Sequence, residues 1–210
     1  NVLKSIAFLA IICFSISCNT EKEPTTTEEI IEQHLKKVGG NLLGNTIKSL
    51  KLVTITEYED NSSVTTTSRL EFPYKLHQND LYAGATQDYI LNGDKGFSLQ
   101  NNLQLKTLKP FEVRNLKESA HLMAFYRWEE RHWKYEYKGK ETLNNQEHFI
   151  LQGINDSIRL GNRVYINTSS LRIKRVEIKG SNFEASSDFN DYFTKNGLSY
   201  PNETITDYGS

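Results

Sequence analysis

Residues 110–128 read PFEVRNLKESAHLMAFYRW, the one interior stretch of the chain with a helical period. Pro110 suits the first turn of a helix, where its missing N–H would have no partner in any case. A helix over residues 113–126 has an apolar face broader than that of an ordinary surface helix. Because this segment lies between two blocks of strands, we expect it to cover one of them. The residues of its apolar face are Val113, Leu116, Ala120, Leu122, Met123, Phe125 and Tyr126.

The chain on both sides of this segment alternates between apolar and polar residues, which is typical of half-buried strands. Residues 50–58 predict one strand, residues 64–71 its Thr-rich partner, and residues 92–96 the turn of a hairpin. Within residues 171–179 the apolar phase slips by one residue. Such a slip predicts a β-bulge near Lys174 and Arg175, since otherwise the apolar side chains would change faces.

A second helix is predicted near the N-terminus. Thr26 and Glu29 have the spacing of a capping box, and Gly39-Gly40 supplies a left-handed stop. Short connections at regular intervals favour one strongly curved antiparallel sheet over a parallel α/β fold. We therefore expect a mainly β protein with an N-terminal helix and an inserted helix. The inserted helix would act as a lid over an apolar cavity of the sheet.

The first eighteen residues have the pattern of a secretory signal peptide. Lys4 precedes an uncharged apolar run that closes on Ser17 and Cys18. The run is shorter than the roughly 20 residues that span a bilayer, and the chain turns polar at once. The Cys18 exit resembles a bacterial lipobox, in which cleavage precedes an acylated cysteine. Cys13 suits this role less well because the bulky Ile12 precedes it. Simple secretion remains the alternative.

These features divide the chain into three parts: a lipoprotein signal peptide (1–17), an acylated Cys18 with a polar tether (18–25), and one domain (26–210). The 25 basic and 26 acidic residues give a formal net charge of −1, without the basic excess that a nucleic-acid partner needs. After cleavage Cys18 would be the only cysteine, so the domain must be stabilised by core packing without a disulfide.

The side chains that support catalysis or metal binding form no recognisable motif. The five histidines (34, 77, 121, 132 and 148) are scattered, without the spacing of metal ligands. The sequence contains no nucleophile elbow and no phosphate-binding loop. His34 is interpreted as a residue on the flank of its helix, and Glu129, Glu130 and His132 as a charged helix exit. We therefore expect no enzymatic activity, no metal and no cofactor.

Several stretches, in their order along nearly the whole mature chain, resemble the LolA/LolB-type lipoprotein carriers, and more closely the LolA-like lipoproteins of Bacteroidetes-type bacteria. The stretches are Val38-Gly39-Gly40, Phe72-Pro73-Tyr74-Lys75-Leu76-His77, Asn92-Gly93-Asp94-Lys95-Gly96-Phe97, Arg163-Val164-Tyr165-Ile166-Asn167, Asp191-Tyr192 and Asn196-Gly197-Leu198-Ser199-Tyr200-Pro201. Family members often have Asp-Gly and Trp where this chain has Asn92-Gly93 and Phe97, and Asp at Asn167. They usually add another strand or two, so we expect the natural chain to continue beyond Ser210.

The resemblance implies an unclosed β-barrel (a half-barrel domain) with a helical lid, which binds acyl chains of lipids or lipoproteins and performs no catalysis. The family's buried arginine, which bonds the closed lid, has its best counterpart in Arg69. An alternative for Arg69 is a strand arginine that faces water. Soluble carriers lack a lipid anchor, which this chain is expected to have at Cys18. The expected cavity and lid residues are Val113, Leu116, Ala120, Met123, Phe125, Phe72, Leu91 and Phe97.

The sequence thus predicts an outer-membrane-anchored lipoprotein of the cell envelope, on the periplasmic or the surface face, that binds lipid and takes part in lipoprotein sorting or transport. One alternative is a structural or interaction lipoprotein without lipid cargo, whose partner is another envelope protein. Exposure of Trp133, Tyr135 and Tyr137 would favour it. A hydrolase with an unrecognised polar site is a third hypothesis.

Overall fold

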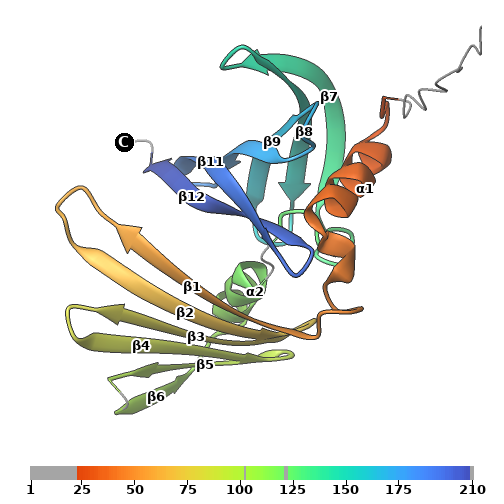
Figure 1. Ribbon diagram of the computed structural model, residues 1–210. Helices are drawn as coiled ribbons and strands as arrows, with labels where there is room; N and C mark the ends of the chain where they lie inside the picture. The colour runs from red at the N-terminus through yellow and green to blue at the C-terminus, as the bar shows by residue number, and fades with distance from the viewer. Residues whose placement is uncertain (1–22, 102, 121–122, 209–210) are drawn as a thin grey trace, which may run out of the picture.

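The computed structural model describes residues 23–101, 103–120 and 123–208, and these residues form two six-stranded antiparallel sheets (Figure 1). The first sheet contains β1 (Ser49–Glu57), β2 (Ser63–Glu71), β3 (Lys75–Tyr82), β4 (Ala85–Asn92), β5 (Lys95–Gln100) and β6 (Gln104–Thr107). The second contains β7 (Lys134–Leu143), β8 (Gln146–Asn155), β9 (Leu160–Asn167), β10 (Ile173–Lys179), β11 (Glu184–Lys195) and β12 (Leu198–Tyr208). Helix α1 (Thr27–Val38) and the 3₁₀ turn η1 (Gly40–Leu42) precede the first sheet, and helix α2 (Pro110–Ser119) lies between the two sheets.

The β1–β6 sheet has two chemically different faces. Each strand pairs with its neighbour in sequence, and the pairs keep one register from β1 to β6. Because successive side chains of a strand point to opposite faces, this register assigns every residue to one face. Leu70, Leu76 and Leu91 contact α2, so we call their side of the sheet the α2 face. The opposite side, which carries Lys51 and Arg69, is the outer face.

The β7–β12 sheet is also a sequential antiparallel meander, but its register shifts twice. One shift lies between Tyr137 and Lys140, and the other between Ile173 and Arg175. The second confirms the bulge predicted near Lys174 and Arg175. It keeps Ile173 and Val176 in contact with one apolar cluster despite the change of phase.

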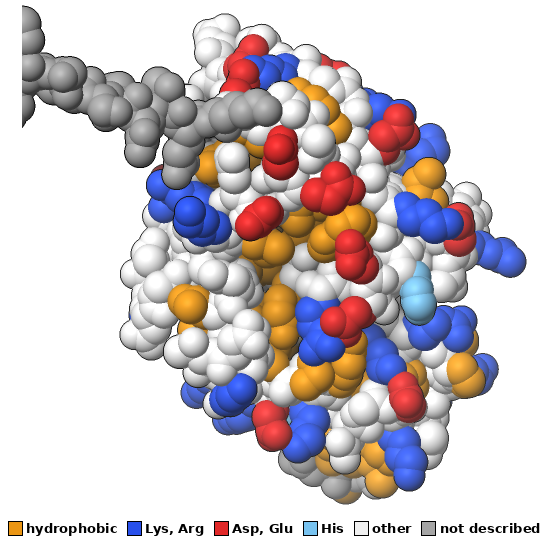
Figure 2. Space-filling view, turned by 90° about the vertical axis from the view of Figure 1, so that its right-hand side faces the viewer, with side chains coloured by type: hydrophobic (Ala, Val, Ile, Leu, Met, Phe, Trp, Pro, Cys, Tyr) orange, Lys and Arg blue, Asp and Glu red, His pale blue; other side chains and the backbone are white. Residues whose placement is uncertain are grey.

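Helix α1 forms as its sequence predicts and is fixed to the second sheet. Thr26 and Glu29 make both bonds of a capping box, and Gly39 ends the helix with a left-handed φ of 78°. Ile30 and Ile31 are buried in a cluster with Phe125, Phe149 and other side chains of the β7–β12 sheet. Seen from the side of α1, charged side chains surround a central strip of apolar ones (Figure 2), so apolar surface on this side is limited.

Two predictions about the architecture need correction. The sequence predicted a single curved sheet, whereas the structure has two sheets with β6 and β7 at separate edges. The inserted helix was expected over residues 113–126, but α2 ends at Ser119, and residues 123–132 form turns. The physical reason is that Met123 and Phe125 pack in two different clusters. Met123 lies with Val38 and Leu43, whereas Phe125 lies with Ile30 and Ile31. One straight helix cannot direct its apolar face into both clusters.

The predicted signal peptide (1–17) and the acylated Cys18 lie outside the described residues, as does most of the tether. Within the described ranges, no helix combines the length and the apolar character required to cross a bilayer.

The C-terminal end of α1 gives a test of close backbone packing. A Cβ atom at Gly39 would lie 2.1 Å from the carbonyl oxygen of Gly197 in the β11–β12 turn, whereas a Cβ at Gly84, with a similar φ of 83°, would meet nothing within 4 Å. We expect Gly84→Ala to cost about 1 kcal/mol from the left-handed backbone alone. Gly39→Ala should cost clearly more, because a backbone group must also move. Urea denaturation measures both, and equal losses would contradict the packing at Gly197.

His34 gives a prediction about pH. Its ring is buried, Nδ1 donates to the carbonyl of Leu171 at 2.7 Å, and burial lowers the pKa of His34 to about 4. Between pH 6.5 and 4 the unfolded chain therefore binds a proton that the folded protein excludes. The free energy of unfolding should fall by about 3 kcal/mol over that interval and gain nothing from this group above it.

The comparison for this prediction is His34→Gln, which retains a donor near Leu171 but cannot titrate. Burial also lowers the pKa of His148, and that contribution is common to both proteins, so the difference between them isolates His34. Denaturant titrations at pH 7.5, 5.5 and 4 give the slopes. The same pH slope in both proteins would contradict the assignment.

Candidate functional site

A row of leucines crosses the α2 face of the first sheet. Leu50 on β1 lies directly opposite Leu70 on β2, Leu70 opposite Leu76 on β3, and Leu76 opposite Leu91 on β4. Gly96 on β5 continues the row beside Leu91. With neighbouring strands about 4.8 Å apart, the row extends about 19 Å from β1 to β5. We call these five residues the leucine row.

Helix α2 covers the central part of this row. Val113, Leu116 and Ala120 contact Leu70, Leu76 and Leu91 in one buried cluster. The contact is close, because a Cβ at Gly96 would come within 2.9 Å of the Val113 side chain. At the start of the helix, the Glu112 carboxylate accepts a hydrogen bond from the backbone N–H of Lys109 at 2.6 Å, which lowers the pKa of Glu112.

A buried ion pair holds the C-terminal end of α2. Arg131 donates to the Glu118 carboxylate at 2.5 Å, and the indole N–H of Trp133 donates to the same oxygen at 3.1 Å. The guanidinium also donates to the carbonyls of Ala124 (3.0 Å) and Tyr126 (3.2 Å). The side chains of Arg131 and Glu118 are 9% and 22% exposed. We call Glu118, Arg131 and Trp133 the latch, because they join α2 to the turns that follow it.

The apolar hollow that the sequence predicted beneath the inserted helix is filled by side chains. Val113, Leu116 and Ala120 are each at most 8% exposed, and they lie directly on the leucines of the sheet. The reason is length: α2 is short enough to lie flat on the row, and Gly96 removes the side chain that would hold it away.

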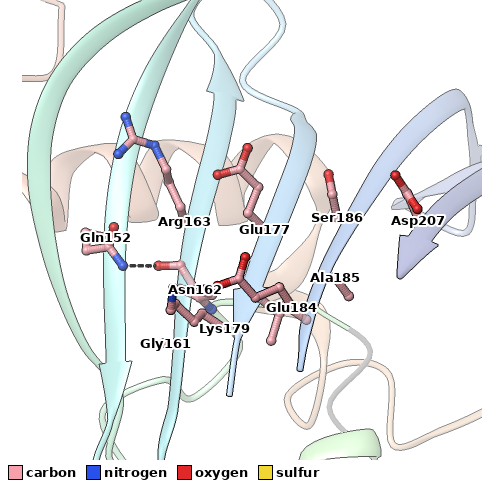
Figure 3. A pocket seen from close by; sticks show the side chains of 11 residues that line it. Gln152, Gly161, Asn162, Arg163, Glu177, Lys179, Glu184, Ala185, Ser186 and Asp207 are labelled. Carbon is pink, nitrogen blue, oxygen red and sulfur yellow. Dashed lines mark hydrogen bonds and ion pairs between the residues drawn. The ribbon is translucent and has the colours of Figure 1, made fainter. Parts of the chain in front are cut away.

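Hollows of the described residues lie elsewhere on both sheets. The first, of about 390 Å³, is on the β7–β12 sheet and faces away from α1 (Figure 3). Side chains of Arg163, Glu177, Ser186 and Asp207 point into it from four neighbouring strands, and Gln152 donates to the backbone carbonyl of Asn162 at 2.8 Å. Such a charged lining does not suit an acyl chain. The second, of about 480 Å³, lies on β1–β3 beside Lys51 and Arg69.

The chain resembles solved structures of several bacterial proteins. A domain from Vibrio parahaemolyticus that is assigned to outer membrane lipoprotein sorting matches with a TM-score of 0.55 at 13% identity, over 86% of this chain and 84% of that one. A LolA superfamily protein from Nitrosomonas europaea matches with a TM-score of 0.54 at 11% identity, over 89% and 93%. This chain has the LolA-like fold. A DUF1329 family protein from Desulfovibrio piger shares it, with a TM-score of 0.55 at 9% identity over 87% and 90%.

At these identities the likeness concerns the fold. No family model matches the chain, and no curated protein sequence matches it. The solved structures nevertheless confirm, at the level of a LolA-like fold, the resemblance that the sequence motifs indicated. The order of strands and helices supports this fold, whereas no single motif does.

The LolA-like fold brings some of the expected cavity residues together and separates others. Five of them meet where α2 packs on the sheet: Val113, Leu116, Ala120, Leu91 and Phe72. Met123 packs instead with Val38, Leu43, Tyr126 and Leu198. Phe125, which is fully buried, contacts α1 and the second sheet.

Two expected residues lie on the other side of the sheet. Phe97 pairs with Ile90 while Leu91 pairs with Gly96, so the Phe97 side chain is on the outer face, away from α2. Arg69 is also on the outer face and is exposed. It corresponds to the water-facing alternative and does not contact the lid. Arg131 is the arginine that bonds to the segment after α2. Sequence reasoning missed it, because its pairing with Glu118 depends on α2 ending at Ser119.

The residues that were considered for catalysis or metal binding are packed in the core or paired with neighbouring side chains. Among the described residues, no three His, Cys, Asp or Glu side chains are grouped so that they could hold a metal ion. His34, interpreted as a flank residue, is buried against Phe125. Glu130 forms an ion pair with Arg127. Trp133, Tyr135 and Tyr137 pack on one another or on core aromatics.

The latch can be tested by Arg131→Met, which retains much of the side-chain volume but leaves Glu118 without a cation. We expect a loss of about 3 kcal/mol in the free energy of unfolding, because a largely buried carboxylate loses its partner. Urea denaturation gives the number, and amide hydrogen exchange should quicken in α2 before it does in α1.

The matched control is Lys134→Met, which removes the exposed pair between Lys134 and Asp156 (3.4 Å, side chains 80% and 77% exposed). It should leave stability unchanged, since exposed pairs contribute little. Equal effects of the two substitutions would show that the latch does not stabilise the position of α2.

Proposed function

We propose that this protein is a non-enzymatic carrier that binds an acyl chain of a lipid or lipoprotein on the leucine row, in the place that α2 occupies in this structure. It would act as an envelope lipoprotein, anchored to the outer membrane through acylated Cys18. The lipoprotein-sorting and LolA superfamily proteins that share its fold support this class of function.

The leucine row carries the proposal, because its length suits the ligand. The hydrocarbon core of a bilayer is about 30 Å thick, so one acyl chain reaches about 15 Å. The row extends about 19 Å across five strands. Its side chains are aliphatic from Leu50 to Leu91, and Gly96 leaves room at the end.

The energies allow an acyl chain to replace the helix. Removing α2 exposes mainly Val113, Leu116 and Ala120, which costs about 4–6 kcal/mol at about 1.5–3 kcal/mol for each larger side chain. A dozen methylene groups taken from water onto the row would gain about 10 kcal/mol, at about 0.8 kcal/mol each. The gain exceeds the cost by only a few kcal/mol once the latch also opens, and such a margin favours reversible binding.

The alternative of an interaction lipoprotein without cargo receives less support. Exposure of Trp133, Tyr135 and Tyr137 would favour it. Trp133 is buried and stacks on Tyr135, and Tyr137 packs on Phe149. These aromatics stabilise the core around α1 and Phe125 instead of forming a docking surface.

A disulfide that fixes α2 to the sheet tests the proposal. Gly96→Cys and Val113→Cys place two thiols where the helix touches β5, and no other cysteine is present in a chain that starts at Asn19. Every described helix and strand lies after that point. We expect the reduced protein to bind palmitate in native mass spectrometry and the oxidised protein to lose binding, because α2 can no longer leave the row.

The control pair, Ser187→Cys with Thr206→Cys, joins directly opposed residues of β11 and β12 in the second sheet. Its oxidation should leave palmitate binding unchanged. Binding by the oxidised Gly96–Val113 pair would place the ligand elsewhere. A reduced protein that binds no palmitate would contradict the carrier function itself.

A further inference from the structure

The outer face of the β1–β6 sheet has a cluster of cations at one end. Lys51 lies directly opposite Arg69, and Arg69 opposite His77. In the next row, Glu71 lies opposite Lys75, and the ladder continues through Asn92 to Lys95. These side chains share one face because the strand register is constant from β1 to β5. In these two rows, four cations therefore lie beside a single carboxylate, that of Glu71.

The arrangement is unfavourable for the isolated protein. Like charges placed directly opposite each other destabilise a sheet, and Lys51 and Arg69 are such a pair. Glu71 is bonded to Lys75 at 2.8 Å. Among the ion pairs of the described residues, none includes Lys51 or Arg69. The hollow of about 480 Å³ lies over these residues, and its lining consists of Ser49, Lys51, Arg69, Glu71, Lys75 and His77 together with the intervening Leu50, Leu70 and Leu76.

The other half of the same face has exposed aliphatic side chains among threonines and other polar residues. Val53 and Ile55 follow Lys51 on β1 and are 53% and 64% exposed, Leu81 on β3 is 44% exposed, and Leu105 on β6 is 65% exposed. The carboxylate of Asp88, which also lies on this face, is buried and bonded to His77 (2.8 Å) and Asn79 (3.1 Å). Glu57 lies at the far end of β1. Exposed aliphatic side chains beside unpaired cations form an amphipathic surface.

We propose that the outer face of this sheet docks on an anionic phospholipid membrane. Lys51, Arg69 and Lys75 would contact the phosphates of the headgroups, while Val53, Ile55 and Leu81 enter the boundary of the acyl region. Basic side chains next to aliphatic ones are the combination that binds such interfaces. Charge complementarity selects this occupant over a second copy of the chain, since a symmetric contact would bring the cation cluster against itself or against an aliphatic half.

This inference does not depend on the proposed function. Docking uses the face of the sheet opposite to α2, so it requires no ligand on the leucine row. It also keeps α2 directed away from the membrane plane, where the latch remains free to open.

Vesicle co-sedimentation tests the docking with the chain that starts at Asn19, which contains every described helix and strand. The probes are vesicles of phosphatidylcholine alone and of equal parts phosphatidylcholine and phosphatidylglycerol. We expect binding to the anionic vesicles only, with a loss as ionic strength rises to about 0.15 M and above. Lys51→Gln with Arg69→Gln should weaken binding about 25-fold, from about fivefold for each cation near an anionic surface.

The matched control is Lys36→Gln with Lys37→Gln, which removes two exposed cations from α1 and leaves the net charge equal to that of the test variant. It should bind as the wild type does. Removing Lys51 and Arg69 should not unfold the protein, because the substitution relieves repulsion between opposed cations. A thermal midpoint at or above that of the wild type checks this point.

A second pair of variants tests the aliphatic half without any change of charge. Val53→Thr with Ile55→Thr preserves the β-branched shape and should weaken binding several-fold, whereas Ile154→Thr, an exposed position on the other sheet, should not. Equal binding to neutral and anionic vesicles would overturn the proposal. So would an equal loss with the α1 control, or self-association that disappears with the Lys51 and Arg69 substitutions.

Discussion

The contact between α2 and the leucine row is the interaction on which the proposed carrier function depends. It is apolar and non-directional, and on the helix side it consists chiefly of Val113, Leu116 and Ala120. Its directional component is at the end of the helix, where the partly buried side chains of Arg131 and Glu118 form an ion pair. A modest apolar contact with one strong polar fastening is suited to a helix that leaves and returns, because the fastening defines where the helix returns.

The two helices of the structure therefore have different physical roles. Helix α1 buries Ile30, Ile31 and His34 almost completely, and its C-terminal glycine lies against the backbone of Gly197. Such a helix cannot move without loss of the core of the second sheet. Helix α2 contributes a smaller apolar contact, chiefly Val113, Leu116 and Ala120, so its displacement has a smaller cost.

Charged side chains gather on the sheet faces that are directed away from the two helices. The α2 face has aliphatic side chains where the helix lies, and the charged hollow of the second sheet faces away from α1. On the first sheet the unpaired cations lie on the outer face, opposite the leucine row. The two faces of one sheet therefore differ in chemistry: aliphatic side chains lie beneath α2, and cations lie beside exposed aliphatic side chains on the outer face.

The sequence by itself determined the local elements of this protein. Capping residues, glycine stops, strand alternation and the slip at Lys174 and Arg175 depend on near neighbours in the chain, and so they could be predicted without coordinates. The LolA-like order of elements could be predicted too, because it is a one-dimensional pattern. The candidate site could be predicted from the sequence only in part. Val113, Leu116, Ala120, Leu91 and Phe72 meet where α2 packs on the sheet, whereas Phe97 and Arg69 lie on the opposite face of that sheet.

Only the tertiary structure decided the rest, since it depends on pairing across long separations. The register of four strands aligns Leu50, Leu70, Leu76 and Leu91, which are unremarkable in sequence. The division into two sheets, the early end of α2 and the pairing of Glu118 with Arg131 follow from how α2 and residues 123–133 pack against the sheets. A hydrophobic period reports that a side chain will be buried, but the partner that buries it is fixed by packing of the whole chain.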